Sequence, residues 1–182
     1  MFIHTFPKLE LFDESTDKFI YRDAITVKLE HSLLAISKWE SEKEKPFLRL
    51  QENGDLSEDD LLFYILCMDL TETLTKEQVK SLTPNELEEI MRYMNKQSTA
   101  TTFSSTKKEK PSKSKIITSE EIYYYMTALN IPFETETWNI YRLFTLIKIC
   151  GIKNNPNKMK KSEVADHYAK INQARRAAKM HK

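Results

Sequence analysis

The chain has 182 residues, of which 28 are Lys or Arg and 27 are Asp or Glu, so its net charge is about +1. This length suits one domain, or one domain with an appendage, and it is sufficient to bury a substantial core. Glycine-loop nucleotide binding is excluded, because such loops need two or three glycines within a few residues, and the only two glycines, Gly54 and Gly151, lie far apart.

The first 30 residues alternate between apolar and polar side chains. The period of two begins at Phe2, pauses at an acidic segment over 13–17, and resumes from Phe19 to Leu29. Alternation of this kind is typical of half-buried strands, and the acidic segment is typical of a turn. The sequence therefore predicts a small N-terminal β-hairpin, with or without a third short strand.

A helical period follows over 32–44, with Leu33, Ile36 and Trp39 along one side. Pro46 is expected to end this helix, because the residue before a proline is disfavoured in the α region. Ser57 then precedes three acidic residues and a wide apolar face that extends to Met68. A capping serine and acidic first turn predict a helix start at this point.

Two capping boxes predict the next helices. Thr75 is followed at the third position by Gln78, and Thr83 is followed by a proline and then by Glu86. In such a box each side chain accepts a hydrogen bond from the other residue's backbone N–H. We therefore expect a short helix after Thr75 and a longer helix from Thr83 to about residue 95.

The remainder of the chain contains a polar linker and three further helical patterns. Residues 104–115 are rich in Ser and Lys and are predicted to form a flexible linker, because they offer little apolar area for burial. Helices are expected from Thr118 to about 129 with a Thr118–Glu121 capping box, from 134 to 150 with apolar residues on nearly every side, and from Ser162 onward. Gly151 is expected to be the left-handed cap of the 134–150 helix.

These patterns predict a mainly α fold: a helical bundle-like domain with a small N-terminal β-hairpin element. Residues 1–103 form the hairpin and the first helices, residues 104–115 the linker, and residues 116–182 a helical C-terminal region with a basic tail. The 134–150 helix needs more cover than its own flank can provide. We therefore expect the two regions to share one core.

No pattern in the sequence predicts catalysis, a metal site or a cofactor. The four histidines have no partner at metal-ligand spacing, and His31 beside Ser32 and Glu30 lacks the glycines of a nucleophile elbow. The two cysteines lie in apolar runs and are interpreted as buried reduced thiols. We expect a non-enzymatic, soluble, cytoplasmic protein without a membrane segment, since a secretory signal and a long apolar span are both missing.

The charges are unevenly distributed. Residues 1–103 have a net charge of −8 and residues 153–182 a net charge of +7. Such asymmetry is typical of an interaction tail or of a self-complementary assembly, in which copies pair head to tail into a homo-oligomer. The basic residues Lys160, Lys161, Arg175 and Arg176 are candidates for an electrostatic contact surface. They also leave open a small nucleic-acid-binding protein, although the near-neutral total charge and the lack of a reader motif argue against nucleic acid as the partner.

Three blocks of the sequence carry a resemblance to a known family. They are VKLEHSLLAISKWESEKEKPF (Val27–Phe47), TATTF (Thr99–Phe103) and IITSEEIYYYMTALNIPFETETWNIYRLFTLIKICGIKN (Ile116–Asn154). In order and spacing they resemble small proteins from the tail-morphogenesis region of tailed bacteriophages and prophages, whose members look like tail assembly chaperones. The chain departs from the family pattern at Lys43 and Tyr125, where that pattern has tryptophans.

The resemblance implies a phage tail assembly chaperone or morphogenesis factor. Its partners would be the tape measure protein and the tail-tube protein. It would act in the host cytoplasm and would be missing from the finished virion. A structural virion component of the tail or neck is the main alternative. Candidate partner-binding aromatic residues, as core or interface anchors, are Trp39, Tyr124, Trp138 and Tyr141.

Overall fold

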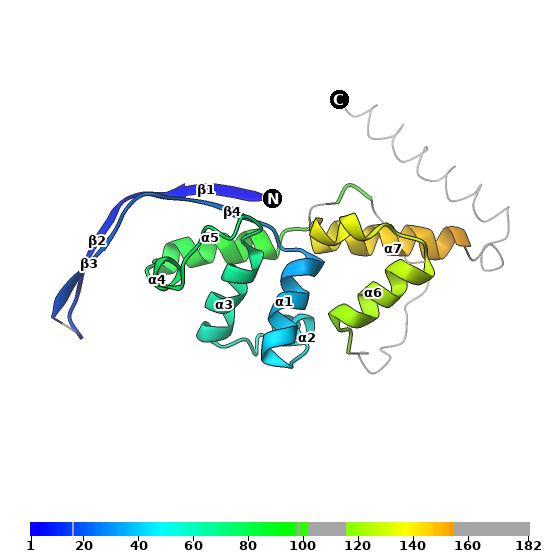
Figure 1. The fold of residues 1–182 in the computed structure, drawn as a ribbon, viewed down its shortest axis with the longest axis horizontal. Coiled ribbons are helices and arrows are strands. Elements are labelled where there is room, and N and C mark those ends of the chain that lie inside the picture. The colour runs from blue at the N-terminus through cyan, green and yellow to red at the C-terminus, as the bar shows by residue number, and fades with distance from the viewer. Residues whose placement is uncertain (16, 98, 102–115, 155–182) are drawn as a thin grey trace, which may run out of the picture.

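The computed structural model describes residues 1–15, 17–97, 99–101 and 116–154 (Figure 1). Within these ranges the protein is mainly helical, with a small β element at its N-terminus, as predicted for a mainly α fold. The predicted linker at 104–115 and the predicted helix after Ser162 lie outside the described residues.

Four short strands form two antiparallel pairs. They are β1 (Phe2–Phe6), β2 (Leu9–Asp13), β3 (Lys18–Arg22) and β4 (Ile25–Leu29). Strand β1 pairs with β4 and β2 pairs with β3, so the predicted hairpin is present but is interrupted between residues 6 and 9 and between residues 22 and 25. In Figure 1 the β2–β3 pair extends as a narrow ribbon away from the helices.

Seven α-helices and one 3₁₀ helix follow in the described ranges. They are α1 (Leu33–Lys43), α2 (Phe47–Asn53), α3 (Glu58–Met68), α4 (Lys76–Lys80), α5 (Pro84–Met94), α6 (Ser119–Ala128), η1 (Phe133–Thr137) and α7 (Ile140–Asn154). Ser32 and Ser57 cap α1 and α3 through their side chains, and both predicted boxes, at Thr75 and at Thr83, form in full. The predicted start at Ser57 and the two predicted boxes are confirmed, because each cap is a local interaction. The cap at Ser32 was not predicted.

Helix α2 was not predicted from the sequence. Its N-cap residue, Pro46, makes no side-chain capping bond, so the sequence carries no start signal of the usual type. At its other end Gly54 has a φ of 75°, and its N–H bonds to the carbonyl oxygens of Leu50 and Gln51. Helix α1 ends at Lys43, close to the predicted end, and its C-cap residue Glu44 adopts the left-handed conformation two residues before Pro46.

The C-terminal helices differ from the prediction in three respects. Thr118 precedes α6 but makes no side-chain capping bond. The predicted 134–150 helix is split, because residues 133–137 form a 3₁₀ turn, Trp138 is extended and α7 begins only at Ile140. Gly151 is not a left-handed cap, because α7 continues past it to Asn154.

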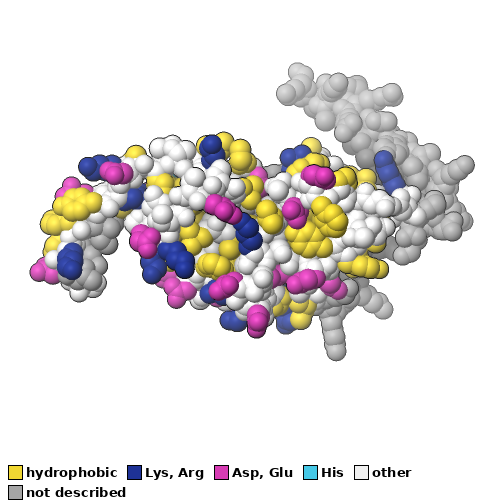
Figure 2. Space-filling model, viewed as in Figure 1, with side chains coloured by type: hydrophobic (Ala, Val, Ile, Leu, Met, Phe, Trp, Pro, Cys, Tyr) yellow, Lys and Arg dark blue, Asp and Glu magenta, His cyan; other side chains and the backbone are white. Residues whose placement is uncertain are grey.

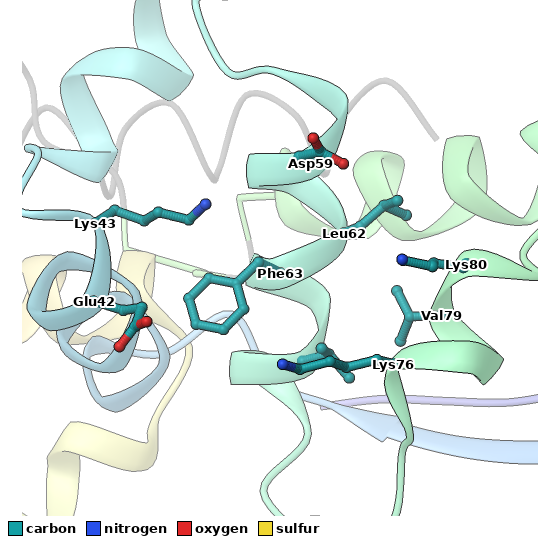
Figure 3. Close-up of a pocket in the computed structure, with 9 residues that line it drawn as sticks. Glu42, Lys43, Asp59, Leu62, Phe63, Lys76, Val79 and Lys80 are labelled. Atoms are coloured by element: carbon teal, nitrogen blue, oxygen red, sulfur yellow. The ribbon is translucent and has the colours of Figure 1, made fainter.

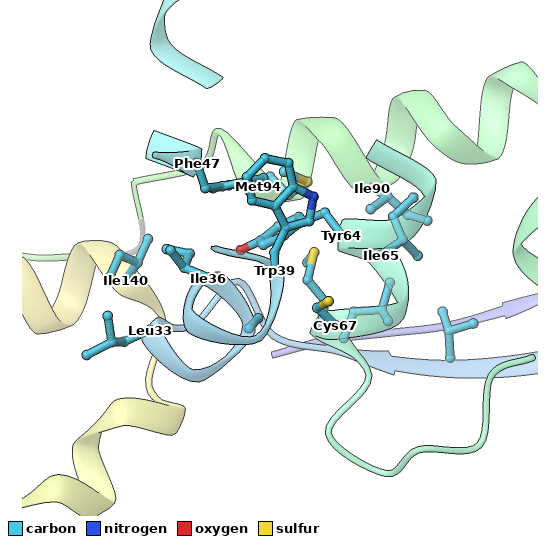
Figure 4. Close-up of a cluster of buried hydrophobic side chains, with 14 of the residues drawn as sticks. Leu33, Ile36, Trp39, Phe47, Tyr64, Ile65, Cys67, Ile90, Met94 and Ile140 are labelled. Carbon is cyan, nitrogen blue, oxygen red and sulfur yellow. The ribbon is translucent and has the colours of Figure 1, made fainter. Parts of the chain in front are cut away.

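The core contains buried side chains from both predicted regions (Figure 4). Phe47 stacks on Tyr64 with ring centroids 3.8 Å apart, and Trp39 meets the Phe47 ring edge-on at 5.1 Å. Ile122 and Ile140, from α6 and α7, belong to the same cluster. Within α7 only Ile140 and Leu143 are fully buried, so the expectation of burial on all sides of this helix is not met.

A buried carboxylate joins three of these helices. Glu40 on α1 accepts hydrogen bonds from the backbone N–H of Phe47 at 2.9 Å and of Ser119 at 2.7 Å. These two groups are at the starts of α2 and α6, where helix N–H groups lack partners within the helix. One side chain therefore anchors the start of α6 to the N-terminal helices, which explains why α6 needs no cap from Thr118.

Candidate protein-interaction surfaces

The four candidate aromatic residues occupy different environments. Trp39 is fully buried and donates its indole N–H to the Asp60 carbonyl oxygen at 3.1 Å. The sequence left open whether Trp39 is a core residue or an interface residue. Because it is fully buried, Trp39 is a core residue. Within the described residues, no ring contact joins any of the four aromatics to another.

Tyr124 is the most exposed of the four, with 68% of its surface accessible. It lies on α6 opposite the buried Ile122 and Met126, because residues two positions apart in a helix point in nearly opposite directions. The ring of Tyr125 meets it edge-on with centroids 5.8 Å apart. Tyr124 therefore presents its ring to whatever approaches this face of α6.

Trp138 and Tyr141 lie near the start of α7. Trp138 is 38% exposed, and the Arg142 guanidinium lies 4.9 Å from the centre of its ring, within the range of a cation–π contact. Tyr141 is half-buried, with its ring 5.9 Å from that of His31. The other four candidates, Lys160, Lys161, Arg175 and Arg176, lie outside the described residues.

The β2–β3 ribbon carries an exposed aromatic face that sequence reasoning did not identify as a site. Phe12 and Phe19 are cross-strand partners with ring centroids 5.0 Å apart, and Tyr21 continues the row at 6.0 Å from Phe19. These side chains are 49%, 55% and 64% exposed, respectively. Figure 2 shows hydrophobic side chains at the outer end of this ribbon. The signal in the sequence was the alternation of apolar and polar residues over these strands. A two-stranded ribbon without a covering layer leaves its apolar face exposed.

A polar cluster lies buried at the junction of β4 and α1. The Glu30 carboxylate accepts hydrogen bonds from the Tyr93 hydroxyl and, at 3.2 Å, from the Asn139 side-chain amide. His31 Nδ1 lies 2.5 Å from the Tyr64 hydroxyl oxygen, and its Nε2 has no hydrogen-bond partner among the described residues. The cluster therefore connects β4 to α3, α5 and the segment before α7.

Burial determines the ionisation of this cluster. Loss of water contact lowers the pKa of His31 from 6.5 to about 4, although the neighbouring Glu30 acts in the opposite direction. Burial also raises the pKa of Tyr64 well above its usual value. His31 is thus neutral at pH 7. The Ser32 side chain accepts the N–H of Ala35, and His31 Nδ1 pairs with the Tyr64 hydroxyl, so the described hydrogen bonds do not join Ser32 and His31 as in a catalytic triad.

Apart from this cluster, the described residues that could carry chemistry are the two cysteines and any group of metal ligands. Cys67 and Cys150 are both free thiols, and burial raises the pKa of Cys67 to about 11, which keeps it protonated. Among the described residues, no three His, Cys, Asp or Glu side chains are grouped as a metal would require. None of the described helices combines the length and apolar character needed to cross a membrane.

Comparison of the chain with protein-family models, with curated proteins and with solved structures gives no match.

Proposed function

We propose that this protein is a tail assembly chaperone or a related morphogenesis factor of a tailed bacteriophage. It acts without making or breaking covalent bonds, by contacts with the tape measure protein and the tail-tube protein in the host cytoplasm. The resemblance of the blocks at 27–47, 99–103 and 116–154 to that family is the reason for naming these partners.

The exposed aromatic face of the β2–β3 ribbon is the observation that carries a protein-binding role. Phe12, Phe19 and Tyr21 lie in one row on an element that projects from the helices. Aromatic side chains are enriched where proteins bind one another, because each buries a large area at a small entropic cost. A two-stranded ribbon is also marginally stable alone and gains stability when a partner covers it.

The proposal also includes a bundle-like helical domain and assembly of the chain into a homo-oligomer. Helices α1, α3 and α6 surround a common set of buried side chains, which supports a bundle-like arrangement of the helical domain. A working chaperone that coats a long client needs many copies, so a homo-oligomer is part of the proposal.

Co-expression with the tape measure protein encoded downstream tests this function. We expect the tape measure protein, insoluble alone, to become soluble and to co-purify with the wild-type chain. The variant Phe12→Ser/Phe19→Ser should lose most of this effect, because it removes the paired rings of the ribbon face. The variant Lys28→Ser/Lys45→Ser, at two exposed residues outside the ribbon face, should retain it.

The proposal would be contradicted if the tape measure protein stays insoluble, or does not co-purify, when it is expressed with the wild-type chain. Mass spectrometry of purified virions separates it from the main alternative, because a chaperone leaves the particle and a tail or neck component stays in it. Stoichiometric recovery of this chain from mature particles would therefore establish the structural role in place of the chaperone role.

A further inference from the structure

A shallow groove runs along the outer side of α3, between α1 and α4. It consists of two hollows with volumes of about 400 Å³ and about 300 Å³. The hollows share Glu42, Phe63 and Leu66, so they form one continuous depression. Figure 3 shows Phe63 and Leu62 on α3 between the α1 side chains and those of α4. The groove is separate from the β2–β3 ribbon, whose residues line neither hollow.

The floor of the groove is apolar. Leu62, Phe63 and Leu66 lie on the side of α3 that faces away from the buried Ile65 and Met68, and all three remain partly exposed. Their spacing repeats about once per helical turn, so they form a stripe along α3. A stripe of this kind next to the core offers apolar area to a partner with a matching stripe.

The walls of the groove indicate which secondary structure fits it. The walls and floor of the larger hollow are helices, whose backbone N–H and C=O groups are engaged within each helix. The smaller hollow is also lined by the segment between α3 and α4, in which the Asp69 carboxylate already accepts the N–H groups of Thr73 and Leu74. A bound strand would find no backbone partners along these helices, and its own N–H and C=O groups would be left unpaired against an apolar floor. A helix satisfies its backbone internally and is therefore the occupant that this groove favours.

The unpaired charges on the two banks are opposite in sign. Lys76 and Lys80 line the α4 bank, and they are one helical turn apart. Glu42 lines the α1 bank, and Asp59 lies on α3 at the start of the floor (Figure 3). None of these four side chains forms an ion pair with a described residue. The two lysines of the α1 bank are already paired, Lys38 with Glu72 at 3.1 Å and Lys43 with Asp60 at 3.2 Å.

We propose that this groove binds an amphipathic helix of a partner protein. The apolar stripe of that helix lies on Leu62, Phe63 and Leu66, and its acidic flank faces Lys76 and Lys80. Its basic flank faces Glu42 on the α1 bank, and Asp59 lies at the start of the floor. The eleven residues of α3 offer about 16 Å of length, which matches about three turns of a bound helix. The identity of the partner as the helical client rests on the proposed function, whereas the groove and its preferred ligand do not.

Fluorescence anisotropy with two synthetic helical peptides tests this site. Both peptides carry Leu at i, i+3, i+4 and i+7. The first has Glu along one flank and Lys along the other, and the second has Lys along both flanks. Because two opposite-charge contacts on α4 become repulsive in the second complex, we expect the wild-type protein to bind the first peptide about tenfold more tightly.

Charge reversal provides the decisive comparison. In Lys76→Glu/Lys80→Glu the unpaired charges on both banks are acidic, so the second peptide should now bind more tightly than the first. The matched control Lys28→Glu/Lys45→Glu changes the net charge equally at exposed residues that line neither hollow, and it should keep the wild-type order. The proposal is overturned if the order of the two peptides is the same in the wild type and in Lys76→Glu/Lys80→Glu, with circular dichroism confirming that both are folded.

A floor variant and the co-expression assay complete the test. Leu62→Asn should weaken both peptides at least about fivefold, and unchanged binding would place them elsewhere than in the groove. If co-expression rescues the tape measure protein but the charge-reversed variant rescues it equally, the tape measure protein is not the partner of the groove and the function stands. If the peptides follow the predicted order but co-expression fails, the function fails and the groove stands.

Discussion

His31 illustrates how one buried side chain makes stability depend on pH. In the folded protein the pKa of His31 is about 4, whereas the ordinary value of 6.5 applies once unfolding exposes the ring. Below pH 6.5 the unfolded chain therefore binds a proton that the folded protein does not accept.

We predict that the free energy of unfolding falls as the pH is lowered from 6.5 towards 4, with a contribution from His31 of about 3 kcal/mol. Urea unfolding at a series of pH values measures this slope. The variant His31→Asn cannot take up the proton, so its profile should be flatter than the wild-type profile over the same range. Parallel profiles would show that His31 is not the responsible group.

Glu40 is a second residue whose effect follows from its partners. Its two carboxylate oxygens accept the N–H groups of Phe47 and Ser119. Glu40→Ala would leave both donors buried and unpaired, so we predict a loss of about 3 kcal/mol in the free energy of unfolding, measured by urea denaturation. Glu52→Ala, at an exposed position on α2, is the control and should change stability by less than about 0.5 kcal/mol. A Glu40→Ala protein as stable as the control would contradict this role.

At the scale of the element, the two glycines have opposite roles. Gly54 ends α2 with a φ of 75°, and a Cβ atom there would meet no neighbour within 4 Å. Gly151 is inside α7, where a Cβ atom would also meet no neighbour within 4 Å. Any effect of adding a methyl group therefore comes from the backbone alone.

We predict that Gly54→Ala lowers the unfolding free energy by about 1 kcal/mol, because an L-residue is strained in the left-handed region. Gly151→Ala should raise it by a similar amount, about 1 kcal/mol, because alanine is the better helix former. Thermal and urea unfolding of the two variants give the comparison. Changes of the same sign would show that one of the two backbone conformations is not as described.

The β2–β3 ribbon is the element whose sequence pattern was clearest and whose role was hardest to predict. Alternation predicted strands at Phe12 and Phe19, and both are present as cross-strand partners. The same pattern does not say whether a helix layer covers that face. In the structure the β1–β4 pair contributes Phe6 and Val27 to the core, whereas the β2–β3 pair leaves its aromatic face exposed.

At the scale of the whole molecule, residues on both sides of the segment 104–115 contribute to one core. Asn139 bonds to Glu30, Ser119 to Glu40, and the N–H of Ile140 to the carbonyl oxygen of His31 at 2.8 Å. Such contacts couple the two parts, because neither can unfold without exposing buried groups of the other.

We therefore predict a single cooperative unfolding transition. The chain has two tryptophans, Trp39 in α1 and Trp138 before α7, so Trp138→Phe and Trp39→Phe each leave one reporter in a different part. In each variant the fluorescence transition should coincide with that of circular dichroism. Separate midpoints for the two signals would show that the two parts unfold independently.

The sequence by itself determined the features that depend on residues close together in the chain. The caps at Ser57, Thr75 and Thr83 were predicted from the sequence, because donor and acceptor are three residues apart. The mainly helical class and the hairpin followed from hydrophobic period for the same local reason.

Only the tertiary structure decided the features that depend on distant residues. Helix α7 begins at Ile140, whose N–H bonds to the backbone carbonyl oxygen of His31, and not at residue 134 as predicted. Helix α6 begins at Ser119, whose N–H bonds to the Glu40 carboxylate, and Thr118 makes no capping bond. The burial of Trp39 and the exposure of Tyr124 were likewise decided by packing. The physical reason is that a side chain's type limits which contacts it can make, while its burial depends on what the rest of the chain places beside it.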